Sequence, residues 1–276
     1  MSNSMSRRNV LGLSAWAMVA VALPSASAPA FAGSTWDGLR PEVFGTRAIE
    51  SGLGVVTLKA PFRPADQRAV PIEINTRFGD GRTVKSVMLV VDENPSPVAA
   101  TFQLGPNQRK FEVKAHVRLN QETRVRAIVE ASDGALYMAS QLVKFAGGQA
   151  ACAAPPTGNP EEIVANMGKM QLSDVADLGT STTIDHRVRL SISHPNHTGM
   201  ALDQQTLLYI PLRMITDLAV RQGDVKLFDM NGSITISENP VFEFDVNLTG
   251  AHDVAVTLKD SDGTAWTRVL PIRAGS

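Results

Sequence analysis

The sequence has one cysteine, Cys152, in 276 residues, and it lacks any strong excess of charge. A lone cysteine in an exported chain points to an intermolecular partner or a free functional thiol, because it has no internal partner for a disulfide. A net charge of −1 gives no electrostatic footprint for nucleic acid or an anionic membrane. The chain also lacks a nucleophile elbow, a phosphate-binding glycine loop and a zinc-protease helix motif. These absences argue against a nucleic-acid-binding protein and against an enzyme.

The first 32 residues have the pattern of an export signal. Arg7 and Arg8 precede an apolar run that is too short for a membrane span of about 20 residues, and Ala30 and Ala32 form a cleavage site. The motif Ser-Arg-Arg-x-Val-Leu favours the twin-arginine route over the general secretory route. Removal of this segment changes the net charge to −3 and leaves no apolar run long enough to cross a membrane. We therefore expect a periplasmic protein.

Two stretches of short, patterned segments predict β-strands. In the first, residues 111–119 alternate strictly between apolar and polar side chains, and residues 124–130 largely repeat the pattern. Residues 87–91 are continuously apolar, which is typical of a central strand covered on both faces. Residues 187–272 have the same alternating character. Turn dipeptides separate the segments at Asp80-Gly81, Asp133-Gly134, Asn231-Gly232 and Asp262-Gly263. The pattern predicts an all-β fold of two immunoglobulin-like β-sandwich domains.

A linker is expected between the two stretches. Residues 146–158 consist mainly of Gly, Ala and Pro and contain almost nothing that could anchor a core. A short helix should follow, because Asn159 can cap it, Pro160 suits its first position and two glutamates come next. A second short helix is expected near residues 41–49. The predicted organisation is a signal at 1–32, a sandwich at 33–146, a linker with Cys152 and a helix at 147–180, and a sandwich at 181–276.

Cys152 lies in the middle of this linker. Its alanine neighbours offer only methyl groups for packing, and Gly147 and Gly148 loosen the backbone before it. We expect an accessible thiol with a pKa of about 8.5, since no Lys, Arg or His lies close in sequence. Such a thiol suits a passive carrier that a partner activates better than a self-activated nucleophile. The alternatives are a cysteine folded back against one sandwich and an intermolecular disulfide dimer through Cys152.

The histidines are the other candidate ligands. His194 and His197 lie three residues apart in the turn His-Pro-Asn-His. A copper or zinc site needs three or four converging ligands, and a turn of this kind does not make two imidazoles converge. We expect both to be surface loop residues, and we predict no metal and no cofactor. His116 falls on the polar side of its predicted strand and should face solvent.

The chain resembles a fusion of the two sulfur-carrier subunits SoxY and SoxZ, most closely the SoxYZ-like carriers found alongside quinoprotein dehydrogenases. The first half has the SoxY order of a twin-arginine signal, a small sandwich and Lys144-Phe145-Ala146-Gly147-Gly148 before a cysteine. The second half resembles SoxZ through 194–200 (HPNHTGM), 236–244 (ISENPVFEF) and the hairpin 260–263 (DSDG). The resemblance covers nearly all of the chain after the signal.

The resemblance implies two immunoglobulin-like subunits and a cysteine, on a glycine-rich arm, that carries sulfur intermediates between the enzymes of thiosulfate oxidation. Cys152 would then be the attachment point, Gly147 and Gly148 part of the arm, and His194 a loop or domain-interface residue. The implied partners are periplasmic sulfur-oxidation enzymes or a quinoprotein dehydrogenase. Unlike the family's free arm, Cys152 has alanines on both sides and continues into a second domain. The alternative function is a non-catalytic binding or assembly module for such a dehydrogenase.

Overall fold

The structure is a computed structural model that describes residues 35–145, 147, 150–175 and 185–272. The predicted signal and cleavage residues Arg7, Arg8, Ala30 and Ala32, and the predicted arm residue Gly148, lie outside these ranges. The twin-arginine signal and the glycine pair therefore stay predictions.

The first half of the described chain forms one helix and eight strands. In order, these are α1 (Thr35–Phe44), β1 (Ile49–Ser51), β2 (Val56–Lys59), β3 (Val70–Arg77), β4 (Val84–Val91), β5 (Val98–Leu104), β6 (Lys110–Val117), β7 (Thr123–Ala131) and β8 (Leu136–Val143).

Two short helices and seven strands follow. They are the 3₁₀ turn η1 (Ala151–Ala153), α2 (Pro160–Asn166), β9 (Met170–Asp174), β10 (Asp185–Ile192), β11 (Ile215–Gln222), β12 (Val225–Gly232), β13 (Val241–Asn247), β14 (Asp253–Asp260) and β15 (Ala265–Pro271). Helix α2 begins as predicted, with the Asn159 side chain accepting a hydrogen bond from the Glu161 N–H at 2.9 Å.

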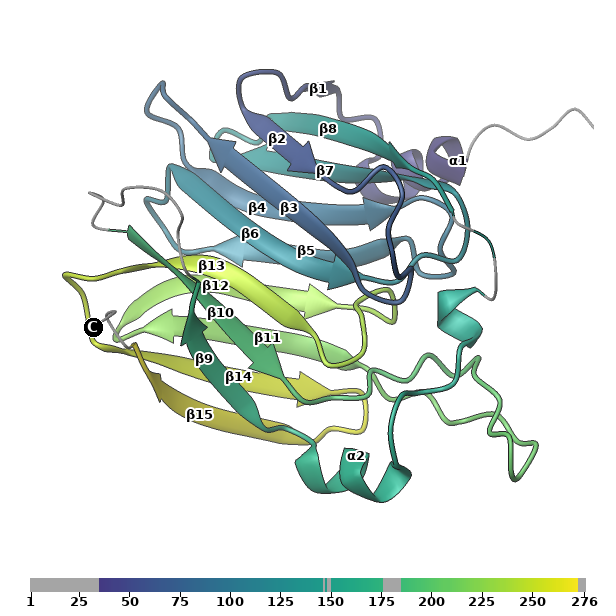
Figure 1. Cartoon of the computed structure of the whole chain (residues 1–276). Helices are drawn as coiled ribbons and strands as arrows, with labels where there is room; N and C mark the ends of the chain where they lie inside the picture. The colour runs from purple at the N-terminus through teal and green to yellow at the C-terminus, as the bar shows by residue number, and fades with distance from the viewer. Residues whose placement is uncertain (1–34, 146, 148–149, 176–184, 273–276) are drawn as a thin grey trace, which may run out of the picture. The chain divides into compact units, whose positions relative to one another are not determined.

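The strands form two sheets that face each other, as the sequence pattern predicts (Figure 1). The nine-stranded sheet has the order β1-β8-β7-β4-β5-β12-β11-β14-β15, and the six-stranded sheet has the order β2-β3-β6-β13-β10-β9. Both sheets run through the two halves of the chain, because β5 pairs with β12 and β6 pairs with β13. The all-β sandwich is confirmed, and the structure adds that strands of the two halves share both sheets.

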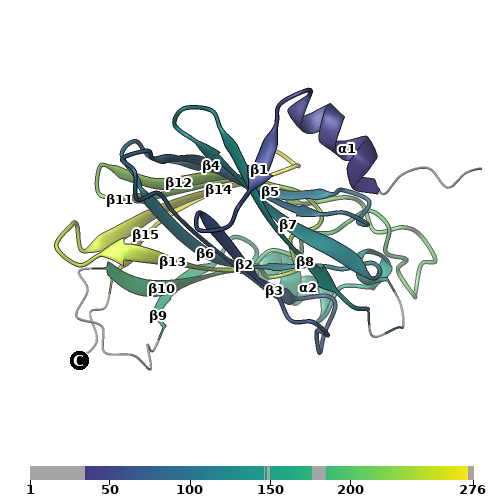
Figure 2. The ribbon, with the colours of Figure 1, turned by 90° about the horizontal axis from the view of Figure 1, so that it is seen from above.

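The burial patterns explain why these segments are strands. Strand β6 alternates between half-buried and buried side chains, so that every second residue enters the core between the sheets. Residues 87–91 of β4 are apolar on both faces, and their outer face is covered because α1 packs on the outer side of the nine-stranded sheet (Figure 2). Trp36 and Phe44 of α1 pack there with Val90, while Leu89 points into the main core. The prediction of a central strand covered on both faces is confirmed.

One hydrophobic cluster extends through both halves. Phe228 of β12 lies at its centre, with ring centroids 5.6 Å from Phe102, 5.8 Å from Phe111 and 5.3 Å from Phe244. Phe102 and Phe111 belong to the first half, whereas Phe228 and Phe244 belong to the second. Edge-to-face aromatic contacts of this kind stabilise a core beyond the burial of their area. The two halves therefore share the main core, and the first half adds a smaller cluster under α1.

Two local predictions are wrong. The helix expected near 41–49 ends at Phe44, because Gly45 adopts a left-handed φ of 58° and Ile49 joins β1. The Asn231-Gly232 pair is not a turn but the end of β12. A side chain at Gly232 would meet the Ile215 carbonyl of the neighbouring strand, so this glycine permits close strand pairing. Among the described residues, no helix is long and apolar enough to cross a membrane.

Replacing Phe228 with alanine should lower the free energy of unfolding by about 3–5 kcal/mol, as is typical of a buried aromatic residue. Because the core is shared, we expect the protein to unfold in one transition that spectroscopic probes in both halves report together. Chemical denaturation measures both quantities, and Leu53→Ala, at a side chain that is 92% exposed, is the control. Two separate transitions would contradict a shared core.

Candidate functional site at the junction of the two halves

Cys152 lies on η1, and the residue is only 1% exposed. Its backbone N–H donates to the Asn120 side-chain oxygen at 2.9 Å, and its carbonyl accepts from the Thr198 hydroxyl at 2.5 Å. The Ala151 N–H donates to the Leu119 carbonyl at 3.4 Å. The turn is therefore held to the loop after β6 on one side and to the His-Pro-Asn-His loop on the other.

The expectation of an accessible thiol is wrong, because Cys152 is buried, whereas the flexible arm at Gly147 and Gly148 stays a prediction. The small alanines that seemed unable to anchor the segment allow it to form a tight turn, and the turn fits between two loops. Gly147 is exposed with a φ of 92°, and its carbonyl accepts a hydrogen bond from the Gln67 side chain at 2.8 Å. The alternative of a cysteine folded back against the sandwich describes the observed state. An intermolecular disulfide would require this turn to leave its site.

The electrostatics of the thiol depend on burial and on one cation. Burial raises the pKa of the Cys152 thiol, and the nearby Arg118 guanidinium partly opposes this rise. The thiol is therefore protonated at neutral pH in the docked turn. Arg118 is distant from Cys152 in sequence, so the absence of a nearby basic residue in the linker did not reveal it.

Arg118 follows β6 directly and is 6% exposed. Its guanidinium donates to the carbonyls of Asn196 at 2.9 Å, Ile234 at 3.1 Å and Ile236 at 2.7 Å. All three carbonyls belong to the second half of the chain. Arg118 therefore ties the two halves together at the point where the Cys152 turn docks.

Asn196 fixes the conformation of the His-Pro-Asn-His loop in the second half. It is fully buried and adopts a left-handed φ of 45°, which asparagine tolerates better than most residues. Its side-chain oxygen accepts from the Ile215 N–H at 2.8 Å, and its amide donates to the Ile236 carbonyl at 2.6 Å. These bonds fix the loop that presents Thr198 to the Cys152 carbonyl.

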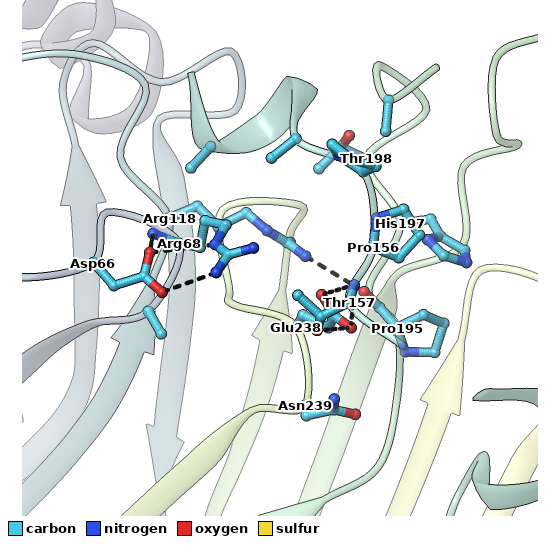
Figure 3. Close-up of a pocket in the computed structure, with 15 residues that line it drawn as sticks. Asp66, Arg68, Arg118, Pro156, Thr157, Pro195, His197, Thr198, Glu238 and Asn239 are labelled. Atoms are coloured by element: carbon cyan, nitrogen blue, oxygen red, sulfur yellow. Dashed lines mark hydrogen bonds and ion pairs between the residues drawn. The ribbon is translucent and has the colours of Figure 1, made fainter. Parts of the chain in front are cut away.

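A cavity of about 120 Å³ lies beside the turn (Figure 3). Ala151 and Ala154 line it on the side of the turn, and Arg68 and Arg118 bring positive charge to it. Arg68 is paired with Asp66 at 3.3 Å. The Glu238 carboxylate also lines the cavity, and it accepts hydrogen bonds from the backbone and hydroxyl of Thr157 (Figure 3). The wall is therefore polar, with both signs of charge.

The two loop histidines are not the surface residues that we expected. The His194 side chain is fully buried, its Nδ1 accepts from the Asn196 N–H at 3.0 Å, and its Nε2 lies 3.6 Å from Asp260, too far for a hydrogen bond. Burial lowers the pKa of His194 to about 4, although Asp260 opposes the shift. His197 instead lines the cavity, and burial lowers its pKa as well. Of the two rings, only that of His197 lines this cavity.

Three smaller points complete the outcome of the sequence predictions. Across the described ranges, no group of three or more His, Cys, Asp or Glu side chains is arranged to hold a metal ion. His116 lies on the predicted face of β6 but is half-buried, with its Nδ1 lacking a hydrogen-bond partner. Asn120, Thr198 and Arg118 were missed as site residues, and only Thr198 lies in a motif that the sequence singled out.

Two protein families match this chain, one in its first half and one in its second half. Residues 40–150 match the family described as "Sulfur oxidation protein SoxY", and residues 181–271 match "Sulphur oxidation protein SoxZ". The chain is a fused SoxYZ-like protein. The SoxY region (40–150) ends two residues before Cys152, so the turn lies between it and the SoxZ region (181–271).

Solved structures give weaker likenesses. The sulfur carrier protein SoxY from Chlorobium limicola f thiosulfatophilum is 22% identical, with a TM-score of 0.33, over 41% of this chain and 97% of that chain. A superoxide reductase (neelaredoxin) from Ignicoccus hospitalis is 11% identical, with a TM-score of 0.28, over 33% of this chain and 79% of that chain. Comparison with curated proteins gives no match.

The SoxY and SoxZ regions meet at the candidate site. Arg118 and Asn120 come from the SoxY region, whereas Thr198 comes from the SoxZ region. Neither region alone could hold the Cys152 turn at both its N–H and its carbonyl. The predicted domain boundaries stay predictions, because strands from both regions lie in each of the two sheets.

We expect the Cys152 thiol to react slowly with a neutral alkylating reagent in the folded protein, because the turn must open first. Thr198→Val removes one hydrogen bond from the turn and should raise the alkylation rate by about fivefold, the effect of roughly 1 kcal/mol. Mass spectrometry of the time course measures the rate. Thr57→Val, at an exposed threonine of β2, is the control. A rate in the unmodified protein equal to that of a cysteine peptide would contradict the docked turn.

Acidification should destabilise the fold through His194. Its pKa is about 4 in the folded protein and 6.5 when unperturbed, so the unfolded chain binds the proton first as the pH falls. Stability is complete above pH 6.5 and falls towards pH 4, by about 3 kcal/mol for this residue. His197 contributes with the same sign, whereas the Asp260 carboxyl, whose pKa is lowered from 3.8, acts only below this window.

Urea denaturation between pH 7 and pH 4 measures this loss. His194→Gln should flatten the pH dependence, and His252→Gln, at an exposed histidine, should leave it unchanged. An equal slope in the His194 variant would show that His194 does not control the acid sensitivity.

Proposed function

We propose that this chain is a periplasmic covalent carrier that presents the Cys152 thiol for sulfur-compound intermediates. The observation that carries the proposal is the position of the only cysteine, on a three-residue turn between the SoxY and SoxZ regions. The turn belongs to neither sheet. The cysteine can therefore move without disturbing the sandwich.

The cost of exposing the thiol is small. The three hydrogen bonds that involve Asn120, Thr198 and Leu119 contribute about 1 kcal/mol each, so opening costs at least about 3 kcal/mol. Fewer than about one molecule in a hundred would then be open at any time. Local openings of this size are common well below global unfolding. A partner that binds the open turn would gain access to the thiol, whereas random disulfide formation would be suppressed.

The chemistry is simple to state for thiosulfate. The thiol and thiosulfate join through a new S–S bond, which gives a cysteine S-thiosulfonate and releases one proton and two electrons. The chain's described residues provide no acceptor for these electrons, so a redox enzyme of the same compartment must take them. The carrier supplies the thiol, the two-point attachment and a shielded resting state, and it catalyses no step itself.

The proposed partners follow from the families and from the resemblance. Enzymes of sulfur oxidation are the first class, and a quinoprotein dehydrogenase is the second. Export by the twin-arginine route agrees with the proposal, because that route moves folded protein and a single signal would serve both regions.

Burial of the thiol favours one second candidate, a binding or assembly module in which Cys152 has no chemical role. In that case the turn only joins the two regions structurally, and Cys152→Ser should leave function intact.

Protein purified from its native compartment without reductant should carry a mass adduct on the peptide that contains Cys152, and reductant should remove it. Cys152→Ser should abolish the adduct and support of substrate oxidation by cells, while the folded structure remains. Intact-mass spectrometry and growth or oxidation assays measure these results. Ser51→Ala, at an exposed residue of β1, is the control. Full function in Cys152→Ser would favour the assembly module.

A further inference from the structure

Arg118 is a buried cation without a carboxylate. It is 6% exposed, and within the part of the chain that the structure describes no carboxylate lies within ion-pair distance of its guanidinium. The nearby Arg68 and Arg213 do have such partners, Asp66 at 3.3 Å and Asp260 at 2.7 Å. Buried charges in proteins are usually paired, because an uncompensated charge is costly to remove from water.

Backbone carbonyls satisfy the hydrogen-bonding capacity of Arg118 but carry no net charge. Its Nη1 donates to three of them, and its Nη2 reaches the Pro195 carbonyl at 3.4 Å. Burial lowers the pKa of Arg118, and the nearby Cys152 and Glu238 oppose this shift. Glu238 is occupied by Thr157, which donates to both of its oxygens. Arg118 therefore has no carboxylate in ion-pair contact among the described residues, and Glu238 offsets its charge only at longer range.

The residues that follow Arg118 hold the turn that bears Cys152. Leu119 and Asn120, which follow Arg118, make the two hydrogen bonds that receive the Ala151 and Cys152 N–H groups. Arg118, Ala151 and Ala154 line the same cavity of about 120 Å³. A cavity of this size accommodates a few water molecules or one small oxyanion.

We propose that Arg118 is the counter-ion of an anionic group carried on Cys152, so that the docked turn binds a sulfur adduct ending in a sulfonate in preference to a neutral adduct. This inference rests on the proposed carrier function and adds the charge of the cargo to it. The empty thiol is protonated and leaves Arg118 without an anion in direct contact. An anionic adduct supplies the missing charge and favours the docked turn over the open one. Glu238, on the same wall, disfavours groups with a higher negative charge.

Two adducts of nearly equal shape test the charge alone. Iodoacetate gives carboxymethyl-Cys152, which is anionic, and iodoacetamide gives carbamidomethyl-Cys152, which is neutral. In both reactions the thiolate sulfur displaces iodide, and the thiol proton passes to the buffer. Hydrogen–deuterium exchange of the peptide containing residues 150–155 reports how often the turn is open in the full chain.

We expect the amides of the turn to exchange on the order of tenfold more slowly in the anionic adduct than in the neutral one, as for a charge-assisted contact. Arg118→Gln should remove the difference, and Arg118→Lys should keep part of it. Arg221→Gln, at a cation that pairs with Asp229 and does not line this cavity, should leave it unchanged. If Arg118→Gln does not fold, the comparison of the two adducts in the unmodified sequence still decides.

Equal exchange in the two adducts, fast or slow, would overturn the role of Arg118. So would a difference that persists in Arg118→Gln. These outcomes are distinct from failure of the carrier function, which the absence of a native adduct and full activity of Cys152→Ser would show. A native adduct together with equal exchange would leave the carrier intact and remove only its charge preference.

Discussion

The structure depends on backbone pairing between the two halves of the chain, β5 with β12 and β6 with β13. This pairing makes each sheet continuous and places Phe102, Phe111, Phe228 and Phe244 in one aromatic cluster. Edge strands that would otherwise expose unpaired N–H and carbonyl groups are thereby covered. The two regions that match separate families therefore share one core.

The same pairing creates the candidate site. Because β6 and β13 are neighbours, Arg118 at the end of β6 meets the loop at 233–239 that leads into β13. Arg118 and Asn94 of the SoxY region bond to backbone and side-chain groups of that loop. The space left beside these contacts receives the Cys152 turn. The fused arrangement thus changes the character of the cysteine segment, since a chain held at both ends can dock by closing one short turn rather than by moving a free tail.

Docking also resolves an apparent conflict between a buried thiol and a carrier function. A permanently exposed thiol would be open to oxidation and to adventitious disulfides. A thiol on a residue within a β-strand could not reach a partner protein without disrupting the sheet. The Cys152 turn lies between these extremes, because only a few hydrogen bonds and two buried residues, Ala151 and Cys152, hold it. Its stability can therefore respond to a partner or, in the proposed carrier, to a group bound to Cys152.

Much of the fold was predictable from local pattern. Strict alternation identified β6, a continuous apolar run identified β4 as covered on both faces, and Asn159 with Pro160 marked the start of α2. Turn chemistry was less reliable, because Asn231-Gly232 ends β12 while Gly223, with a φ of 54°, lies in the turn between β11 and β12. The sequence alone does not distinguish a glycine that forms a turn from one, such as Gly232, that allows two strands to approach closely.

The sequence by itself determined the all-β class, the two strand-rich stretches, the short helix and the importance of a single cysteine, because these depend on residue type and on spacing along the chain. Only the tertiary structure decided that the halves share their sheets, that Cys152 is buried and that Arg118 lies near it. The physical reason is that burial and charge at a site are set by residues far apart in sequence. Arg118, Cys152 and Thr198 meet only after β5–β12 and β6–β13 have paired.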